Sequence, residues 1–127
     1  MMGELTFDVL AATLRQDTHD LVGFHEVLAD KLAAALPEGA VRVRRGGLPF
    51  QAKRPMAELE TLLGDQTFMA VHQNGRFEHR LARVVRGIAL KNSVVPFSEW
   101  LETLTHSLWA EAQESEETRE ALERFLT

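Results

Sequence analysis

The chain has 127 residues, of which 45% are hydrophobic and 26% are charged, and it contains no cysteine. This length and composition suit one globular domain with its own core, and they exclude disulfides and thiolate metal sites. The net charge of −5 conceals an asymmetry. Residues 42–91 hold ten Lys/Arg against four Asp/Glu, a net charge of +6, whereas the flanking segments hold four against fifteen, a net charge of −11.

No uncharged apolar stretch approaches the ~18 residues that a membrane span requires. The first residues, MMGELTFDVL, lack the basic start and apolar run of a signal peptide. We therefore expect a cytoplasmic location and no membrane partner.

Residues 6–36 are predicted to be helical, because apolar residues recur at helical spacing until Pro37-Glu-Gly ends the pattern. Asp17 falls inside the apolar stripe, which is unfavourable in an unbroken helix. A kink or break near Asp17, with Asp17 or Thr18 capping a second helix, would remove that conflict. The stripe comprises Phe7, Leu10, Leu14, Leu21, Phe24, Leu28 and Leu32.

From Ala40 onward the period of the hydrophobic pattern changes to two, which is typical of β-strands. Gly64-Asp65 and Asn74-Gly75 are turn dipeptides, and Asn-Gly favours a tight hairpin because both central residues need positive φ. Gly87 is interpreted as a bulge in the last strand. The expected strands are residues 41–45, 56–63, 66–73 and 76–90, in a four-stranded antiparallel meander.

The two hairpin turns set a register that divides the side chains between two faces of the sheet. The turn at 74–75 pairs His72 with Phe77, and the turn at 64–65 pairs Leu59 with Ala70. The inner face then holds Ala57, Leu59, Leu63, Phe68, Ala70, His72, Phe77, His79 and Leu81, and the outer face holds Glu58, Glu60, Met69, Val71, Glu78 and Arg80.

Two helices are expected after the sheet, over residues 98–113 and 115–126, with Ser98 as the cap of the first. Their apolar stripes would cover one face of the sheet together with the N-terminal helix. The predicted fold class is α+β, a two-layer sandwich formed by a single domain over residues 1–127. In architecture alone this resembles secretion chaperones and small nucleoid-associated dimers, and fold does not imply function.

Three histidines, His25, His72 and His79, are expected to face the core, which makes them weak candidates for a metal site. No HxH or HExxH spacing supports a metal, so core histidines bonded to the backbone are the simpler interpretation. No cofactor is expected. Nucleophile motifs such as G-x-S-x-G and phosphate loops are absent from the sequence, and an enzyme is the less favoured alternative.

The segment 41–54, VRVRRGGLPFQAKR, contains five cations and no acid. Clustered cations with a stacking ring are typical of nucleic-acid or anion binding. The acidic character of the whole chain instead favours contact between this segment and acidic groups of this chain or of a partner. The candidate binding residues are Arg42, Arg44, Arg45, Phe50, Lys53 and Arg54.

Trp100 and Trp109 project toward opposite flanks of their helix, so one of them is a candidate anchor for a contact. Met69 and Val71 interrupt the charged outer face of the sheet. These four residues form the candidate interface. The favoured hypothesis is a small non-enzymatic protein-interaction module, an adaptor or chaperone-like binder that forms a homodimer and binds another protein. The first alternative is nucleic-acid or anion binding by residues 41–54. The second alternative is a metal-binding protein or an enzyme that uses the inward-facing histidines.

Overall fold

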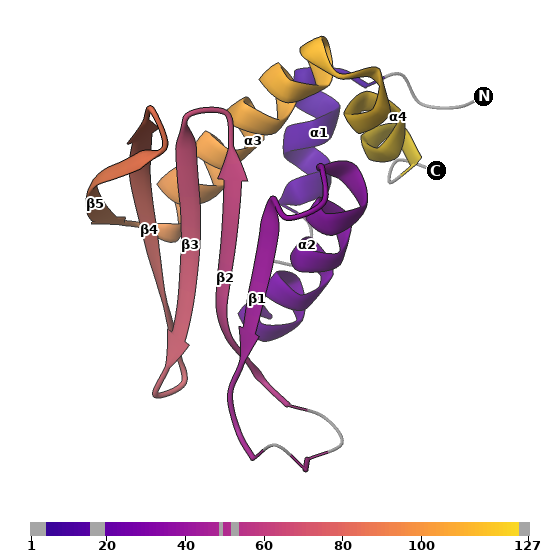
Figure 1. Cartoon of the computed structure of the whole chain (residues 1–127). Coiled ribbons are helices and arrows are strands. Elements are labelled where there is room, and N and C mark those ends of the chain that lie inside the picture. Colours follow the sequence, from indigo (N-terminus) through magenta and orange to yellow (C-terminus); the bar gives the residue numbers. More distant parts are fainter. Residues whose placement is uncertain (1–4, 16–19, 49, 52–53, 125–127) are drawn as a thin grey trace.

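A five-stranded antiparallel sheet has all four described helices on one side: α2 and α3 pack on the sheet, and α1 and α4 pack against those helices (Figure 1). This computed structural model describes residues 5–15, 20–48, 50–51 and 54–124. The predicted α+β class and the two-layer arrangement are confirmed. In chain order the elements are α1 (Phe7–Leu14), α2 (Leu21–Ala35), β1 (Val41–Arg45), β2 (Met56–Leu63), β3 (Gln66–Gln73), β4 (Arg76–Val85), β5 (Ile88–Val95), α3 (Phe97–Glu114) and α4 (Glu116–Arg124).

The predicted N-terminal helix is divided into α1 and α2. Thr6 caps α1, because its side chain accepts a hydrogen bond from the Val9 amide, and Asp20 caps α2 by accepting from the Gly23 amide. A break in this region was expected. The proposed capping residues Asp17 and Thr18 lie outside the described residues, and the observed cap of α2 is Asp20.

The first two hairpins follow the predicted registers. His72 pairs with Phe77, and Leu59 pairs with Ala70, which in turn pairs with His79. Asn74 and Gly75 both have positive φ, of 54° and 76°, as a tight turn of this kind requires. One predicted inner residue is corrected. The register shifts between Arg44 and Arg45, and Met56 rather than Ala57 is the buried residue at the start of β2.

The prediction of one strand over residues 76–90 was wrong, because the chain reverses at Arg86-Gly87 and returns as a fifth strand. These two residues have φ values of 52° and 79°, so they form a tight turn like the one at Asn74-Gly75. Arginine is not among the residues that favour the first position of such a turn, which is why the sequence did not reveal it. The irregularity ascribed to Gly87 lies instead between Ala82 and Val84, where the pairing with β5 shifts.

The core lies between the helices and the inner face of the sheet. Leu59, Phe68 and Ala70 of the sheet and Leu104 and Leu108 of α3 are completely buried. Ser98 is inside α3, which begins at Phe97, so it is not the predicted cap. Among the helices that the structure describes, none combines the length and the apolar character needed to cross a membrane.

Candidate functional site

The buried polar centre of the protein is a pair of histidines contributed by α2 and β4. His25 is 0% exposed and His79 is 3% exposed. Their Nε2 atoms lie 3.0 Å apart, which is a hydrogen-bonding distance. The antiparallel registers position His79 on the inner face, and the helical stripe positions His25 opposite it. Sequence analysis placed both residues in the core but did not indicate that they contact each other.

The backbone fixes which nitrogen of each histidine carries a proton. The Nδ1 atom of His25 lies 2.6 Å from the carbonyl oxygen of Leu21, and a carbonyl can only accept, so this Nδ1 donates. In a neutral His25 the Nε2 atom must then accept. The Nε2 atom of His79 therefore donates to it, and the two rings form a directed chain of hydrogen bonds that ends at a backbone carbonyl.

Aromatic rings surround this pair and separate it from the third candidate histidine. The ring of Phe77 stacks on His25 with centroids 4.0 Å apart and planes inclined by 6°. His72 stacks on the opposite face of Phe77 at 4.3 Å and 8°. Phe97 and Trp100 also contact the pair. Because Phe77 stands between them, the three histidines share a face of the sheet but do not converge on one point.

Burial favours the neutral forms of both buried histidines. It lowers the pKa of His79 to about 4, and repulsion from His25 contributes. Burial also lowers the pKa of His25, opposed by its hydrogen bond to Leu21 and assisted by His72. Over the ranges 5–15, 20–48, 50–51 and 54–124, no group of three or more His, Cys, Asp or Glu residues is arranged to hold a metal ion. The buried contact between His25 and His79 therefore holds α2 against the sheet.

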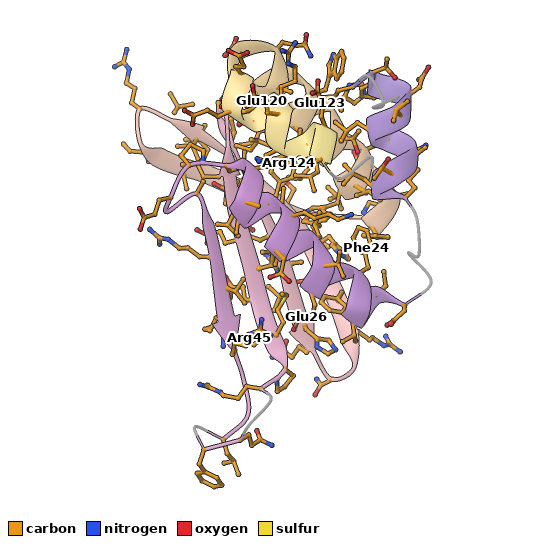
Figure 2. The ribbon with its side chains drawn as sticks, turned by 90° about the vertical axis from the view of Figure 1, so that its right-hand side faces the viewer. Phe24, Glu26, Arg45, Glu120, Glu123 and Arg124 are labelled. Carbon is orange, nitrogen blue, oxygen red and sulfur yellow. The ribbon has the colours of Figure 1, made fainter. Side chains whose placement is uncertain are left out.

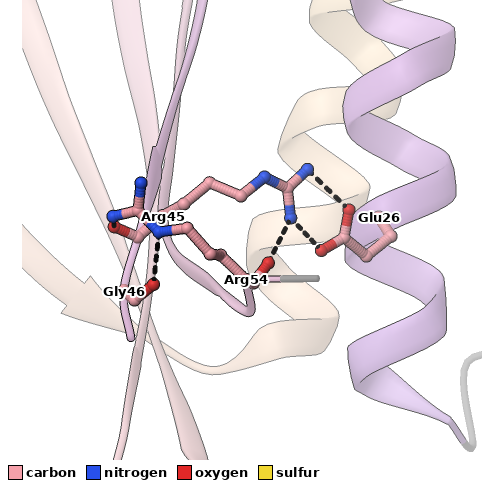
Figure 3. Close-up of polar contacts among 4 residues, drawn as sticks. All are labelled: Glu26, Arg45, Gly46 and Arg54. Atoms are coloured by element: carbon pink, nitrogen blue, oxygen red, sulfur yellow. Dashed lines mark hydrogen bonds and ion pairs between the residues drawn. The ribbon is translucent and has the colours of Figure 1, made fainter. Parts of the chain in front are cut away.

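The cations of the basic segment are largely engaged by groups of the same chain. Arg45 forms a two-pronged ion pair with Glu26 of α2, with distances of 2.5 and 2.9 Å (Figures 2 and 3). The hydrogen bonds that Arg45 donates to the Glu26 carboxylate raise the pKa of Arg45. Arg54 donates to the carbonyl oxygens of Gly46 and Arg45, at 2.9 and 3.0 Å. These contacts close the base of the segment that joins β1 to β2.

The rest of the basic segment is more open. Arg44 lies 3.3 Å from Glu58 on the neighbouring strand, and Arg42 is exposed beside Glu60 in the register. Phe50 is 82% exposed. Lys53 lies outside the described residues. The predicted cluster of cations therefore lies along β1 and the loop that follows it. Its arginines are paired with, or lie opposite, acidic residues of the same chain.

The four candidate interface residues fall in different environments. Trp100 is 1% exposed and belongs to the core, so we do not retain it in a candidate interface. Trp109 is partly buried and contacts Phe7 of α1. Met69 and Val71 are half-buried on the outer face of the sheet, as expected. No described helix covers this outer face (Figure 1).

The edge strand β5, which sequence analysis missed, presents an open apolar surface. Ile88, Leu90 and Val94 are exposed by 67%, 49% and 57%, and Val85 of the adjoining β4 is 44% exposed. Val85, Ile88 and Leu90 were expected to extend the inner sheet face within the predicted strand 76–90, whereas Val94 was expected to lie beyond that strand. A signal for the extra strand was present in the eight residues IALKNSVV, which follow a glycine and contain a single charge.

A groove of about 470 Å³ adjoins the end of β5, where β4 continues beyond its neighbour. Its lining includes Leu21, Phe77, His79, Val94 and Phe97. The groove is mainly apolar, and its wall reaches one of the buried histidines. In comparisons with known proteins, no family model, no curated protein and no solved structure matches this chain.

Proposed function

We propose that the protein is a small non-enzymatic protein-interaction module, adaptor or chaperone-like, that joins another polypeptide by strand addition along β5. The observation that carries this proposal is the open edge of β5, which presents unpaired backbone groups over eight residues. Such an edge is a template for a further strand. The exposed apolar side chains of Ile88, Leu90 and Val94 provide surface that an added strand would bury.

The histidine pair supports this function indirectly. His25 and His79 are engaged with each other and with Leu21, and the pair lies inside an aromatic cluster, so it serves the packing of α2 on the sheet. A contiguous apolar patch exposed on a folded chain is typical of a protein-interaction surface. We place the interaction at β5 because its edge combines apolar side chains with open backbone.

The test compares arginines placed on the two edges of the sheet. Leu90→Arg combined with Val94→Arg should prevent strand addition at β5, and Val43→Arg on β1 is the matched control. The full-length chain, immobilised from its own cells with bound proteins cross-linked, should retain a partner in the wild type and in the β1 control. The β5 variant should lose it, and hydrogen exchange should show that the β5 amides facing away from β4 are protected only in the bound state. Equal capture and equal exchange in all three proteins would contradict the proposal.

A second candidate function is anion or nucleic-acid binding by residues 41–54. It is favoured by the 82% exposure of Phe50 and by the exposed Arg42. Against it stand the ion pairs that Arg44 and Arg45 make within the chain. DNA or RNA binding that weakens steeply with salt, and is lost on changing Arg42 and Phe50 to Ala, would support it. If neither DNA nor RNA binds at low salt, nucleic-acid binding by residues 41–54 is excluded.

A further inference from the structure

The edge of β5 is suited to a self-complementary interface, in which the same surface of two copies meets. Its apolar residues are spread along the whole strand, and its one charged residue, Lys91, lies near the middle. We propose, on the basis of the strand addition proposed above, that the polypeptide joined at β5 is a second copy of this chain. The two five-stranded sheets then continue into each other about a two-fold axis.

The pairing of β4 with β5 indicates how the two copies of β5 would align. Ile88 pairs with Val85, and Val95 pairs with His79, so both ends of β5 direct these side chains to the helix-covered side. Ala89 and Val94 pair with residues of the outer side. Ile88 therefore faces the helix-covered side, whereas Val94, which is also even-numbered, faces the outer side. The change occurs between Ala89 and Asn92, where the register with β4 shifts.

This change of sides, combined with pairing over the full length of β5, selects one symmetric alignment. In an antiparallel pair, residues directly opposite each other project to the same side of the sheet. Placing Ile88 opposite Val95 of the partner subunit, and Ala89 opposite the partner's Val94, satisfies this condition at both ends. The same alignment sets Lys91 opposite the partner's Asn92, so the two like charges avoid direct opposition.

Each copy also supplies both a protruding side chain and a receiving groove. Ile88, at 67% exposure, is the most exposed large apolar residue of β5. In this alignment it lies beside the partner's Val95, which lines the groove together with Pro96 and Phe97 in each chain. The two-fold axis repeats the contact, so one surface provides both halves of the interface.

Charge complementarity extends the match beyond the strands. Arg86 in the β4–β5 turn precedes Ile88 by two residues, so it approaches the start of α3 in the other copy. Glu99 is exposed there, in the first turn of α3. We therefore expect Arg86 of each copy to pair with Glu99 of the partner subunit. Because the pair is formed twice, reversing either charge places two repulsive contacts in the dimer.

Charge reversal tests this inference on the full-length chain. Sedimentation equilibrium of the wild type should give a molecular mass of twice the 14.3 kDa of one chain. Arg86→Glu and Glu99→Arg should each raise the dimer dissociation constant by about five- to thirty-fold, as expected for two exposed ion pairs. The double variant should return it close to the wild-type value. Thermal unfolding of each variant separates an effect on the α3 helix from an effect on the interface.

The absence of cysteine from the natural chain permits a second test without background. In the variant Ala89→Cys with Val94→Cys, oxidation should yield a covalent dimer, because these positions oppose each other across the axis. Within one chain they are about 16 Å apart along the strand, too far for a disulfide. Ala89→Cys alone is the control and should remain uncross-linked.

The outcomes separate this inference from the proposed function. If the chain stays monomeric at all concentrations but captures another protein through β5, the inferred homodimer is contradicted and the proposed strand addition is not. A dimer that neither cross-links nor responds to charge reversal overturns this alignment and therefore the inference. A dimer disrupted by Met69→Lys but insensitive to every change in β5 overturns the inference, and it overturns the proposed function as well if the β5 variant also captures partners as the wild type does.

Discussion

β1 and β5 form the two open edges of one sheet, and they differ in length, charge and attachment. β1 has five residues, of which Arg42, Arg44 and Arg45 are charged. β5 has eight residues and only Lys91 is charged. Short, charged edges resist the addition of further strands, whereas long apolar edges accept them. The comparison teaches that the two ends of this sheet are suited to different roles.

The attachment of the two ends to the helices differs as well. β1 is tied to α2 by a surface ion pair between Arg45 and Glu26, with side chains 38% and 36% exposed. β4, the neighbour of β5, is tied to α2 by the buried contact of His79 with His25. Salt screens the first kind of attachment, and acid weakens the second. Four experiments exploit this difference, and they are ordered by the size of the expected effect.

The largest loss of stability is expected from His79→Ala. This change removes a buried ring and leaves the Nε2 atom of His25 without its donor. We expect the free energy of unfolding to fall by about 3 kcal/mol, combining the cavity with the unpaired group. Urea denaturation measures it, with His106→Ala as the control, because His106 is an exposed histidine of α3 whose ring stacks on Phe7. A loss no greater than in the control would show that the histidine pair does not fasten this end of the sheet.

Acid should produce the next largest effect, through the same pair. The pKa of His79 is lowered from 6.5 to about 4, so the unfolded chain binds more protons than the folded one between these values. The stabilisation is complete above pH 6.5 and is lost as the pH falls toward 4. His79 alone should account for about 2 kcal/mol between pH 7 and pH 5. Replacing both His25 and His79 with Leu should flatten this part of the stability profile, and an unchanged slope would contradict the assignment.

Transferring the charge of β1 to β5 tests the edges themselves. Leu90→Arg with Val94→Arg should weaken self-association by at least about thirty-fold, because each copy would then have to bury two charged side chains where the wild type buries apolar ones. Analytical ultracentrifugation over a concentration series gives the dissociation constant. The variant Val43→Arg on β1 should leave that constant unchanged. An equal effect of the two variants would remove the distinction between the edges.

The smallest effect is expected at the β1 attachment. Arg45→Ala removes the ion pair with Glu26, and an exposed pair of this kind contributes about 1 kcal/mol or less. The difference from the wild type should shrink as salt rises to 1 M, because the charges are screened. Thermal unfolding at low and high salt measures it. A loss that is insensitive to salt would mean that packing of the arginine side chain, rather than its charge, holds β1.

The repeating features of the chain were predictable from its sequence. The period of two and the turns at Gly64-Asp65 and Asn74-Gly75 gave the correct registers, so the division into inner and outer faces followed. The hairpin at Arg86-Gly87 was not predictable by the same rule, because an arginine occupies its first turn position in a left-handed conformation. Missing that reversal concealed β5, and with it the surface on which the proposed function rests.

The sequence by itself determined which side chains of the first two hairpins face the helices, except at the start of β2, because the alternation of strands and the spacing of helices are local properties of the chain. Only the tertiary structure decided that His25 contacts His79, that Glu26 engages Arg45 and that Trp100 is buried rather than exposed. These contacts join residues distant along the chain, and their geometry depends on how α2 and α3 lie across the sheet. Local periodicity contains no information about that placement.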